Sequence, residues 1–421
     1  MLREWRVFQW QEALGSGARV ALIGLLLQAT WLASPALAAE EPDFHWLNGT
    51  NPQRVAPLQT GPLTWTLLVD TYYGQALNQP ADHTVFPTTT APRHHEINLN
   101  LGLLGVEVTE QEGLYGKLVL QGGNYVDAIF GADPSVGRGA YNSLAGMRTI
   151  QQAWAGHRFP VLSGLNVVMG LFPAYIGLDS YLPQENWNYT HNLCSDFTPY
   201  YLQGLMAQLY PRPELKAELW LVNGWQTLGK TGEGFGLGYS LNWRLGDRLS
   251  LTHNVLGGQL GADPTRLRIF TDNACQWRYA VAPWPGVKHL ALAAVADLGH
   301  EGASGQVGGQ PATLFGGGGL LHRVVFNDQW AATLRASSFY DPQRLVALAP
   351  PGATSGGAPL WAGEGTATLD YSPSPWMLYR LEARHDLANT PYVAGPGGIT
   401  ATPPDFRLSG SRLVLNATLR F

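Results

Sequence analysis

The last ten residues of the chain, Arg412–Phe421, read R-L-V-L-N-A-T-L-R-F and decide the fold. Apolar and polar side chains alternate along this stretch, which is the two-residue period of a β-strand with one wet face. The apolar face carries Leu413, Leu415, Ala417, Leu419 and Phe421, and the polar face carries Arg412, Asn416, Thr418 and Arg420. In a soluble sandwich the apolar face packs into a core, whereas in a transmembrane barrel it contacts lipid and the polar face lines the lumen.

The terminal position of Phe421 distinguishes this strand from an ordinary sandwich strand. A strand that ends on an aromatic residue resembles the closing strand of Gram-negative outer-membrane barrels, where that residue is an assembly signal. The resemblance implies that the barrel-assembly machinery reads Phe421 and that the apolar face contacts outer-membrane lipid. The rest of the sequence can be compared with that architecture.

The N-terminus predicts export. A positive leader with Arg3, Arg6 and Arg19 precedes the apolar run Val20–Ala33, and Ser34–Ala38 ends in the A-x-A pattern that signal peptidase reads. We therefore expect residues 1–38 to be a signal peptide that is cleaved before Ala39. The alternative, a retained membrane anchor, needs about 20 apolar residues, and this run is shorter.

Composition narrows the class of exported protein. Only 14% of the 421 residues are charged, whereas about 25% is usual for an aqueous globular protein. No stretch after the leader has the apolar length of a transmembrane helix. Removing residues 1–38 takes three Arg and two Glu from totals of 26 basic and 31 acidic residues, which leaves a formal charge of −6. This mildly acidic balance argues against a nucleic-acid partner.

Strand-like runs and connections of alternating length fill the rest of the chain. Sixteen such runs lie between Leu63 and Phe421, and tight turns such as Asn327-Asp328 alternate with long connections such as Gly74–Arg93. An even strand number places both chain ends on the periplasmic side, with short turns in the periplasm and long loops outside the cell. The predicted fold is therefore an all-β, transmembrane antiparallel β-barrel of about sixteen strands. Fourteen or eighteen strands remain alternatives. Residues 39–62 would form a periplasmic N-terminal segment, and residues 63–421 the barrel.

Side-chain parity predicts which residues face the lumen. In the second run Ile97, Leu99, Leu101 and Leu103 would face outward, and Asn98 and Asn100 inward. In Trp376–Asp386 one face carries four charges, which need water. The predicted pore-lining residues are Asp70, Asn98, Asn100, Lys117, Glu218, Arg335, Glu364, Asp370, Arg380, Glu382, Arg384 and Asp386. Because neither sign dominates, the prediction is weak ionic selectivity; each residue could equally belong to a structural ion pair.

Short motifs along the first two thirds of the chain resemble the OmpL-like putative β-barrel porin-2 family. They are Asp70-Thr71-Tyr72-Tyr73, Asn98-Leu99-Asn100, Gln152-Ala153, Gly170–Pro173 with Ile176-Gly177, Asn186–Thr190, Pro199, Gly204 and Val222–Trp225. The resemblance is good over Trp65–Leu298 and is carried only by pattern beyond it. It implies an outer-membrane pore, although Leu178 stands where the family leads us to expect an acidic residue.

The long connection Pro173–Thr198 is the candidate for a loop that folds into the barrel and narrows it. Its candidate constriction residues are Asp179, Glu185, Trp187, Tyr189 and His191. The alternative is a lid over the mouth of the barrel. Two cysteines, Cys194 and Cys275, form no C-x-x-C motif, and in an oxidising compartment they could form a disulfide.

Enzyme motifs are missing from the sequence. It contains no G-x-S-x-G elbow, no H-E-x-x-H helix and no phosphate-binding loop, so we predict no catalytic activity, no cofactor and no metal. The predicted function is passive diffusion of small hydrophilic solutes or ions through a porin in the outer membrane of a Gram-negative bacterium. The alternative is a receptor, adhesin or scaffold with a blocked lumen. A homo-oligomer is possible.

Overall fold

A computed structural model describes residues 58–109, 113–131, 133–135, 144–230, 232–261, 263–348 and 358–420. The predicted signal peptide and Phe421 lie outside these residues. Among the described helices, none has the length and apolar character that crossing a membrane requires.

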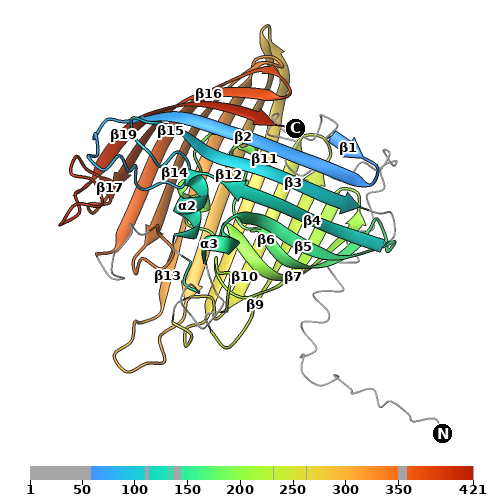
Figure 1. Ribbon diagram of the computed structural model, residues 1–421, viewed down its shortest axis with the longest axis horizontal. Helices are drawn as coiled ribbons and strands as arrows, with labels where there is room; N and C mark the ends of the chain where they lie inside the picture. Colours follow the sequence, from blue (N-terminus) through green and yellow to red (C-terminus); the bar gives the residue numbers. More distant parts are fainter. Residues whose placement is uncertain are drawn as a thin grey trace. The chain divides into compact units, whose positions relative to one another are not determined.

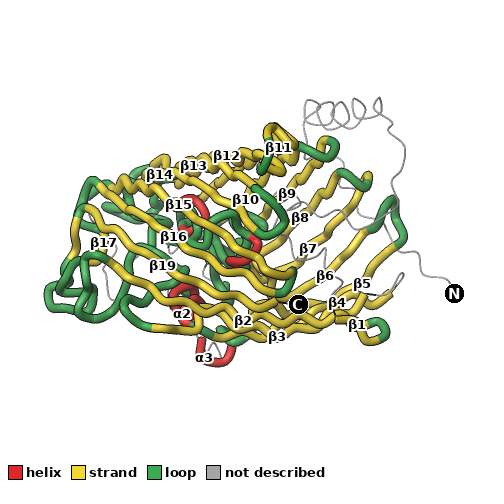
Figure 2. Tube along the Cα trace, turned by 90° about the horizontal axis from the view of Figure 1, so that it is seen from above, coloured by secondary structure: helices red, strands yellow, loops and turns green. Residues whose placement is uncertain are grey.

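Sixteen long antiparallel strands close into a barrel (Figures 1 and 2). They are β2 (Leu63–Ala76), β3 (Ile97–Thr109), β4 (Gly113–Gly122), β5 (Ile150–Phe159), β6 (Leu165–Pro173), β7 (Tyr201–Arg212), β8 (Leu215–Val222), β9 (Gly236–Leu245), β10 (Leu249–Gly258), β11 (Arg268–Trp284), β12 (Val287–Glu301), β13 (Thr313–Val325), β14 (Trp330–Asp341), β15 (Leu360–Ser374), β16 (Met377–Ala388) and β19 (Ser409–Arg420). Each strand pairs with its sequence neighbours, and the last strand, β19, pairs with β2 to complete the ring. The predicted closed sixteen-stranded barrel is confirmed.

Several short elements lie in the connections and were not predicted. They are α2 (Asn124–Phe130), α3 (Leu144–Met147), the 3-10 turn η4 (Pro183–Glu185), α4 (Leu193–Asp196) and the small hairpin of β17 (Val393–Ala394) with β18 (Phe406–Arg407). A short strand, β1 (Leu58–Thr60), pairs with the start of β2. It falls within the predicted N-terminal segment 39–62.

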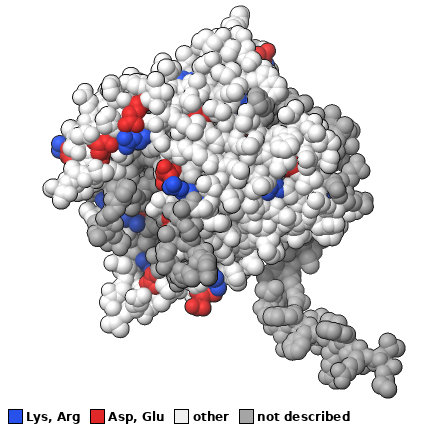
Figure 3. Space-filling view, in the orientation of Figure 1, with Lys and Arg blue, Asp and Glu red and all other residues white. Residues whose placement is uncertain are grey.

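Burial along the strands is inverted relative to a water-soluble protein. In β16 exposure alternates strictly, so that Leu381 is 52% exposed while its neighbour Arg380 is 1% exposed. Other large apolar side chains that face outward include Leu219, Leu237, Leu334, Leu413 and Leu415. Charged side chains are sparse on the face drawn in Figure 3. An apolar exterior around a polar interior is what contact with acyl chains requires.

The outward assignment of Leu101 and Leu103 is wrong. Leu101 is fully buried and packs with Leu68 and Val119, which face the interior. The cause is a bulge between β2 and β3, where Asp70 pairs with Leu101 but Thr71 pairs with Leu99. The extra residue, Asn100, shifts the alternation by one position, so every later residue of β3 changes face.

Candidate functional site

The segment 173–198, which we call the inner loop, connects β6 to β7 and lies inside the barrel. Every residue from Asn186 to Tyr200 is buried. The inner loop bonds to side chains or carbonyls of β2, β10, β11, β13, β14, β15, β16 and β19. Because these eight strands make up half of the sixteen-stranded ring, the inner loop occupies the lumen (Figure 2).

Glu382 of β16 binds the middle of the inner loop. Its carboxylate accepts the backbone N–H of Tyr189 at 2.7 Å and that of Thr190 at 3.1 Å. The hydroxyl of Thr190 donates to it at 2.6 Å, and the hydroxyl of Thr368 at 2.7 Å. A carboxylate has about four acceptor sites, so all of them are used. Glu382 is therefore a structural acceptor for the loop.

Four arginines of β13 to β16 bind carbonyl oxygens of the same loop. Arg380 donates to Pro183 and Asn186, both at 2.6 Å. Arg323 donates to Trp187 at 3.1 Å, Arg335 to Thr190 and His191, and Arg384 to His191 at 2.6 Å. An irregular buried segment leaves carbonyl groups outside any regular backbone ladder, and the guanidinium groups supply their donors.

The arginines are themselves paired with wall carboxylates. Asp370 lies between Arg323 at 2.7 Å and Arg380 at 3.1 Å. Arg335 pairs with Glu364 at 2.8 Å, and Arg384 with Asp386 at 2.8 Å. The charged wall of β13 to β16 is therefore a network that holds the inner loop in place.

A second polar cluster lies at the seam where β19 closes on β2. The carboxylate of Asp70 accepts hydrogen bonds from Asn100 at 2.8 Å, Thr418 at 2.9 Å and the hydroxyl of Tyr189 at 3.1 Å. Asn416 also donates to it. Asp70 thus joins the strand seam and the bulged residue Asn100 to the inner loop.

The loop meets a different surface on β9 to β12. Tyr175 donates its hydroxyl to the carbonyl of Val255 at 2.7 Å, and a side chain at Gly238 would occupy the position of that hydroxyl. Asp272 accepts the backbone N–H of Gly177 at 2.9 Å. Directly across the strand pair, the Asp297 carboxylate has no hydrogen-bond partner among the described residues. The lumen wall around Asp272 and Asp297 is therefore acidic, and the adjoining strands β13 to β16 carry the arginines.

A family model described as "Putative beta-barrel porin-2, OmpL-like" matches residues 62–421. The chain belongs to this porin family. Its predicted membership is confirmed, and its barrel is of the outer-membrane porin type. Comparison with curated protein sequences gives no match.

Three solved structures illustrate the similar fold. The anion-selective porin from Comamonas acidovorans has 12% identity and a TM-score of 0.54, covering 85% of this chain and 99% of that chain. OmpT of Vibrio cholerae has 7% identity and a TM-score of 0.52, with coverages of 87% and 100%. OprB of Pseudomonas putida has 10% identity and a TM-score of 0.52, with coverages of 86% and 94%. At these identities the likeness shows the fold alone.

The five candidate constriction residues of this porin mostly stabilise the loop itself. Asp179 accepts the backbone N–H of Asn192, and Glu185 accepts the hydroxyl of Ser180. His191 bonds to the carbonyl of Ser180 at 2.8 Å and stacks on Tyr125. Trp187 is buried, and Tyr189 bonds to Asp70 and Glu382. Burial also raises the pKa of Tyr189, so its phenol stays protonated.

Three predicted pore-lining residues bond to other parts of the wall and its edge. Lys117 pairs with Glu107 at 3.1 Å, Glu218 with Lys216 at 3.0 Å, and Asn98 donates to Glu96 at 2.8 Å. Arg323, which the alternation along β13 also predicts to face inward, binds the loop as well. Nothing in the sequence predicts its hydrogen bond to the carbonyl of Trp187 in the loop.

The possible disulfide does not form. Cys194 is buried in α4, and Cys275 lies half-exposed on the outward parity of β11, so the barrel wall separates them. Within the described ranges no group of three or more His, Cys, Asp or Glu residues could hold a metal ion.

Proposed function

We propose that the chain is a porin that gives small hydrophilic solutes or ions passive diffusion across the outer membrane of a Gram-negative bacterium. The observation that carries the proposal is the inverted burial of the barrel, with leucines outside and charged side chains inside. A closed sixteen-stranded ring of this kind is wide enough for an aqueous channel. Family membership and the porin fold support the same conclusion.

The inner loop would be the constriction of that channel. Solutes would pass between the loop and the wall, along which the arginines of β13 to β16 adjoin the acids of β11 and β12. Such interleaved charges favour weak ionic selectivity, because neither sign forms a complete ring. The predicted pore-lining residues are part of this proposal. Arg380, Glu382 and Arg384 would affect permeation mainly by holding the inner loop in position.

A receptor, adhesin or scaffold with a blocked lumen is the second candidate. The observation in its favour is the unbroken burial of Asn186–Tyr200, which leaves little exposed surface on the inner loop. In that case the long connections would be the active part of the molecule.

Conductance separates the two candidates. Purified, folded barrel in a planar bilayer should give steady channels with modest ion preference. Arg380→Ala should raise the single-channel conductance, because Arg380 holds two loop carbonyls. Lys288→Ala is the control, since Lys288 lies on the outer face and pairs with Asp328 at the β13–β14 turn. A folded barrel that stays silent in both the wild type and Arg380→Ala would overturn the porin proposal and favour the scaffold.

A further inference from the structure

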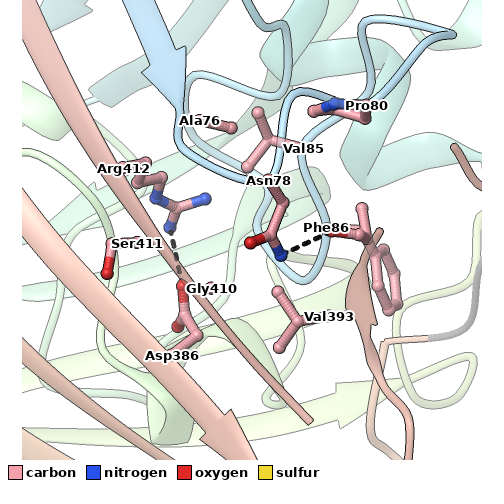
Figure 4. Close-up of a pocket in the computed structure, with 11 residues that line it drawn as sticks. Ala76, Asn78, Pro80, Val85, Phe86, Asp386, Val393, Gly410, Ser411 and Arg412 are labelled. Carbon is pink, nitrogen blue, oxygen red and sulfur yellow. Dashed lines mark hydrogen bonds and ion pairs between the residues drawn. The ribbon is translucent and has the colours of Figure 1, made fainter. Parts of the chain in front are cut away.

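A small cavity lies beside the barrel seam, between the strands and two connections (Figure 4). Its volume is about 20 Å³, and it is partly open to solvent. Val85 and Phe86 of the β2–β3 connection and Val393 of β17 form one side. Asp386 and Arg412 supply the charged groups of its lining.

Arg412 has no hydrogen-bond partner at this cavity. Its side chain is only 4% exposed, and none of its Nε, Nη1 and Nη2 atoms bonds to a described residue. The nearest carboxylate oxygen, Oδ2 of Asp386, is 3.9 Å from Nη2, which is too far for a hydrogen bond. A guanidinium group cannot lose its proton in a protein, so a buried one without partners needs another source of negative charge.

Arg384 adds to the same positive charge. It lies directly across the strand pair from Arg412, and its Nη2 atom also has no partner. The two guanidinium groups share one adjacent carboxylate, Asp386, which is bonded to Arg384 at 2.8 Å. Glu382, further down the same strand, is saturated by the inner loop and by Thr368. The Arg412 guanidinium and the Nη2 atom of Arg384 therefore carry N–H groups that no described residue accepts.

We propose that Arg412 and Arg384 form a binding site for a small inorganic anion. The unpartnered N–H groups would donate to it, and the cavity beside Arg412 would admit it from the side of the β2–β3 and β16–β19 connections. The small volume of the cavity favours an ion of the size of chloride. An inorganic oxyanion would compete with chloride for the same N–H groups. The site does not depend on conduction, because it follows from unpaired donors and a cavity.

Chloride binding can be measured directly with ³⁵Cl NMR on the folded barrel in an uncharged detergent. The wild type should broaden the ³⁵Cl line, and Arg412→Gln should weaken chloride binding by at least about tenfold, the effect of losing one charge-assisted hydrogen bond. Arg420→Gln is the matched control. Arg420 is an inward arginine of the same strand, but it donates to the carbonyls of Pro375 and Gln184.

The outcomes separate a site from general electrostatics. Unchanged broadening in Arg412→Gln, or an equal loss in Arg420→Gln, would overturn the site and leave water as the occupant. Arg412→Lys should retain part of the chloride binding, because lysine keeps the positive charge but lacks the planar set of N–H donors of the guanidinium group. Competition by inorganic phosphate would show that oxyanions also enter. A barrel that binds chloride but does not conduct would refute the proposed function and leave this site standing.

Discussion

Replacing Glu382 by Gln should detach the inner loop from the barrel wall. The carboxylate accepts four donors, namely the backbone N–H groups of Tyr189 and Thr190 and the hydroxyls of Thr190 and Thr368. Glutamine has the same shape, but only its oxygen can accept hydrogen bonds. Its NH₂ group is itself a donor, so it cannot accept from the donors that faced the second carboxylate oxygen. Two donors therefore lose their acceptor.

The magnitude follows from the number of lost bonds. A buried donor without an acceptor costs about 1–3 kcal/mol, so two of them cost about 4 kcal/mol. Since about 1.4 kcal/mol corresponds to a factor of ten, the open form of the loop should become about a thousandfold more populated relative to the docked form. Amide hydrogen exchange at Tyr189 and Thr190 reports this population, because exchange needs the local opening.

The assay compares exchange at these two amides in folded wild type and in Glu382→Gln. Glu301→Gln is the control, since Glu301 is an equally buried lumen carboxylate whose partners are Arg266 and Arg268, outside the inner loop. Heat-modifiable electrophoretic mobility verifies that each barrel is folded. If both amides of Glu382→Gln exchange at the wild-type rate, Glu382 does not hold the loop and the reasoning fails.

Three further predictions concern other parts of the barrel. Asp297→Asn should raise the free energy of unfolding in urea by about 1 kcal/mol. It removes a buried carboxylate that faces Asp272 and has no hydrogen-bond partner among the described residues. A lower free energy of unfolding would contradict this. Cys275 should react with a maleimide in folded, detergent-solubilised protein, whereas Cys194, whose thiol pKa is raised by burial, should react only after unfolding, and reduction should leave the electrophoretic mobility unchanged. A hydrogen bond from Arg93 lowers the pKa of Glu96 from 4.5 to about 2, so the stability that this pair contributes is present above pH 4.5 and is lost as the pH falls towards 2. Proteolysis of the β2–β3 connection should therefore increase over that range in the wild type, whereas Glu96→Gln should remove the pH dependence.

The parts of the fold that depend on local pattern could be predicted from the sequence. Alternation along β16 and β19 specifies a strand with one polar and one apolar face, because successive side chains point to opposite sides of a sheet. Connection lengths predicted the antiparallel order and the even strand number. The rule of alternating side chains failed at Asn100, where β3 has one more residue than its neighbour β2. Such a bulge depends on how the two strands pair, which the sequence of one strand does not show.

The position of the inner loop is a property of the tertiary structure. Arg335 and Thr190 are 145 residues apart, and Glu382 and Tyr189 are 193 apart, so their contacts exist only once the ring has closed. Tertiary structure also decided that the wall separates Cys194 from Cys275, and that Arg412 faces a cavity while Arg420 is bonded. Sequence by itself determined most of the side chains that turn inward, since these follow a two-residue period, but not those of β3 beyond Asn100. Which partner each inward charge meets was decided by the folded ring, because those partners come from distant strands and from the loop it encloses.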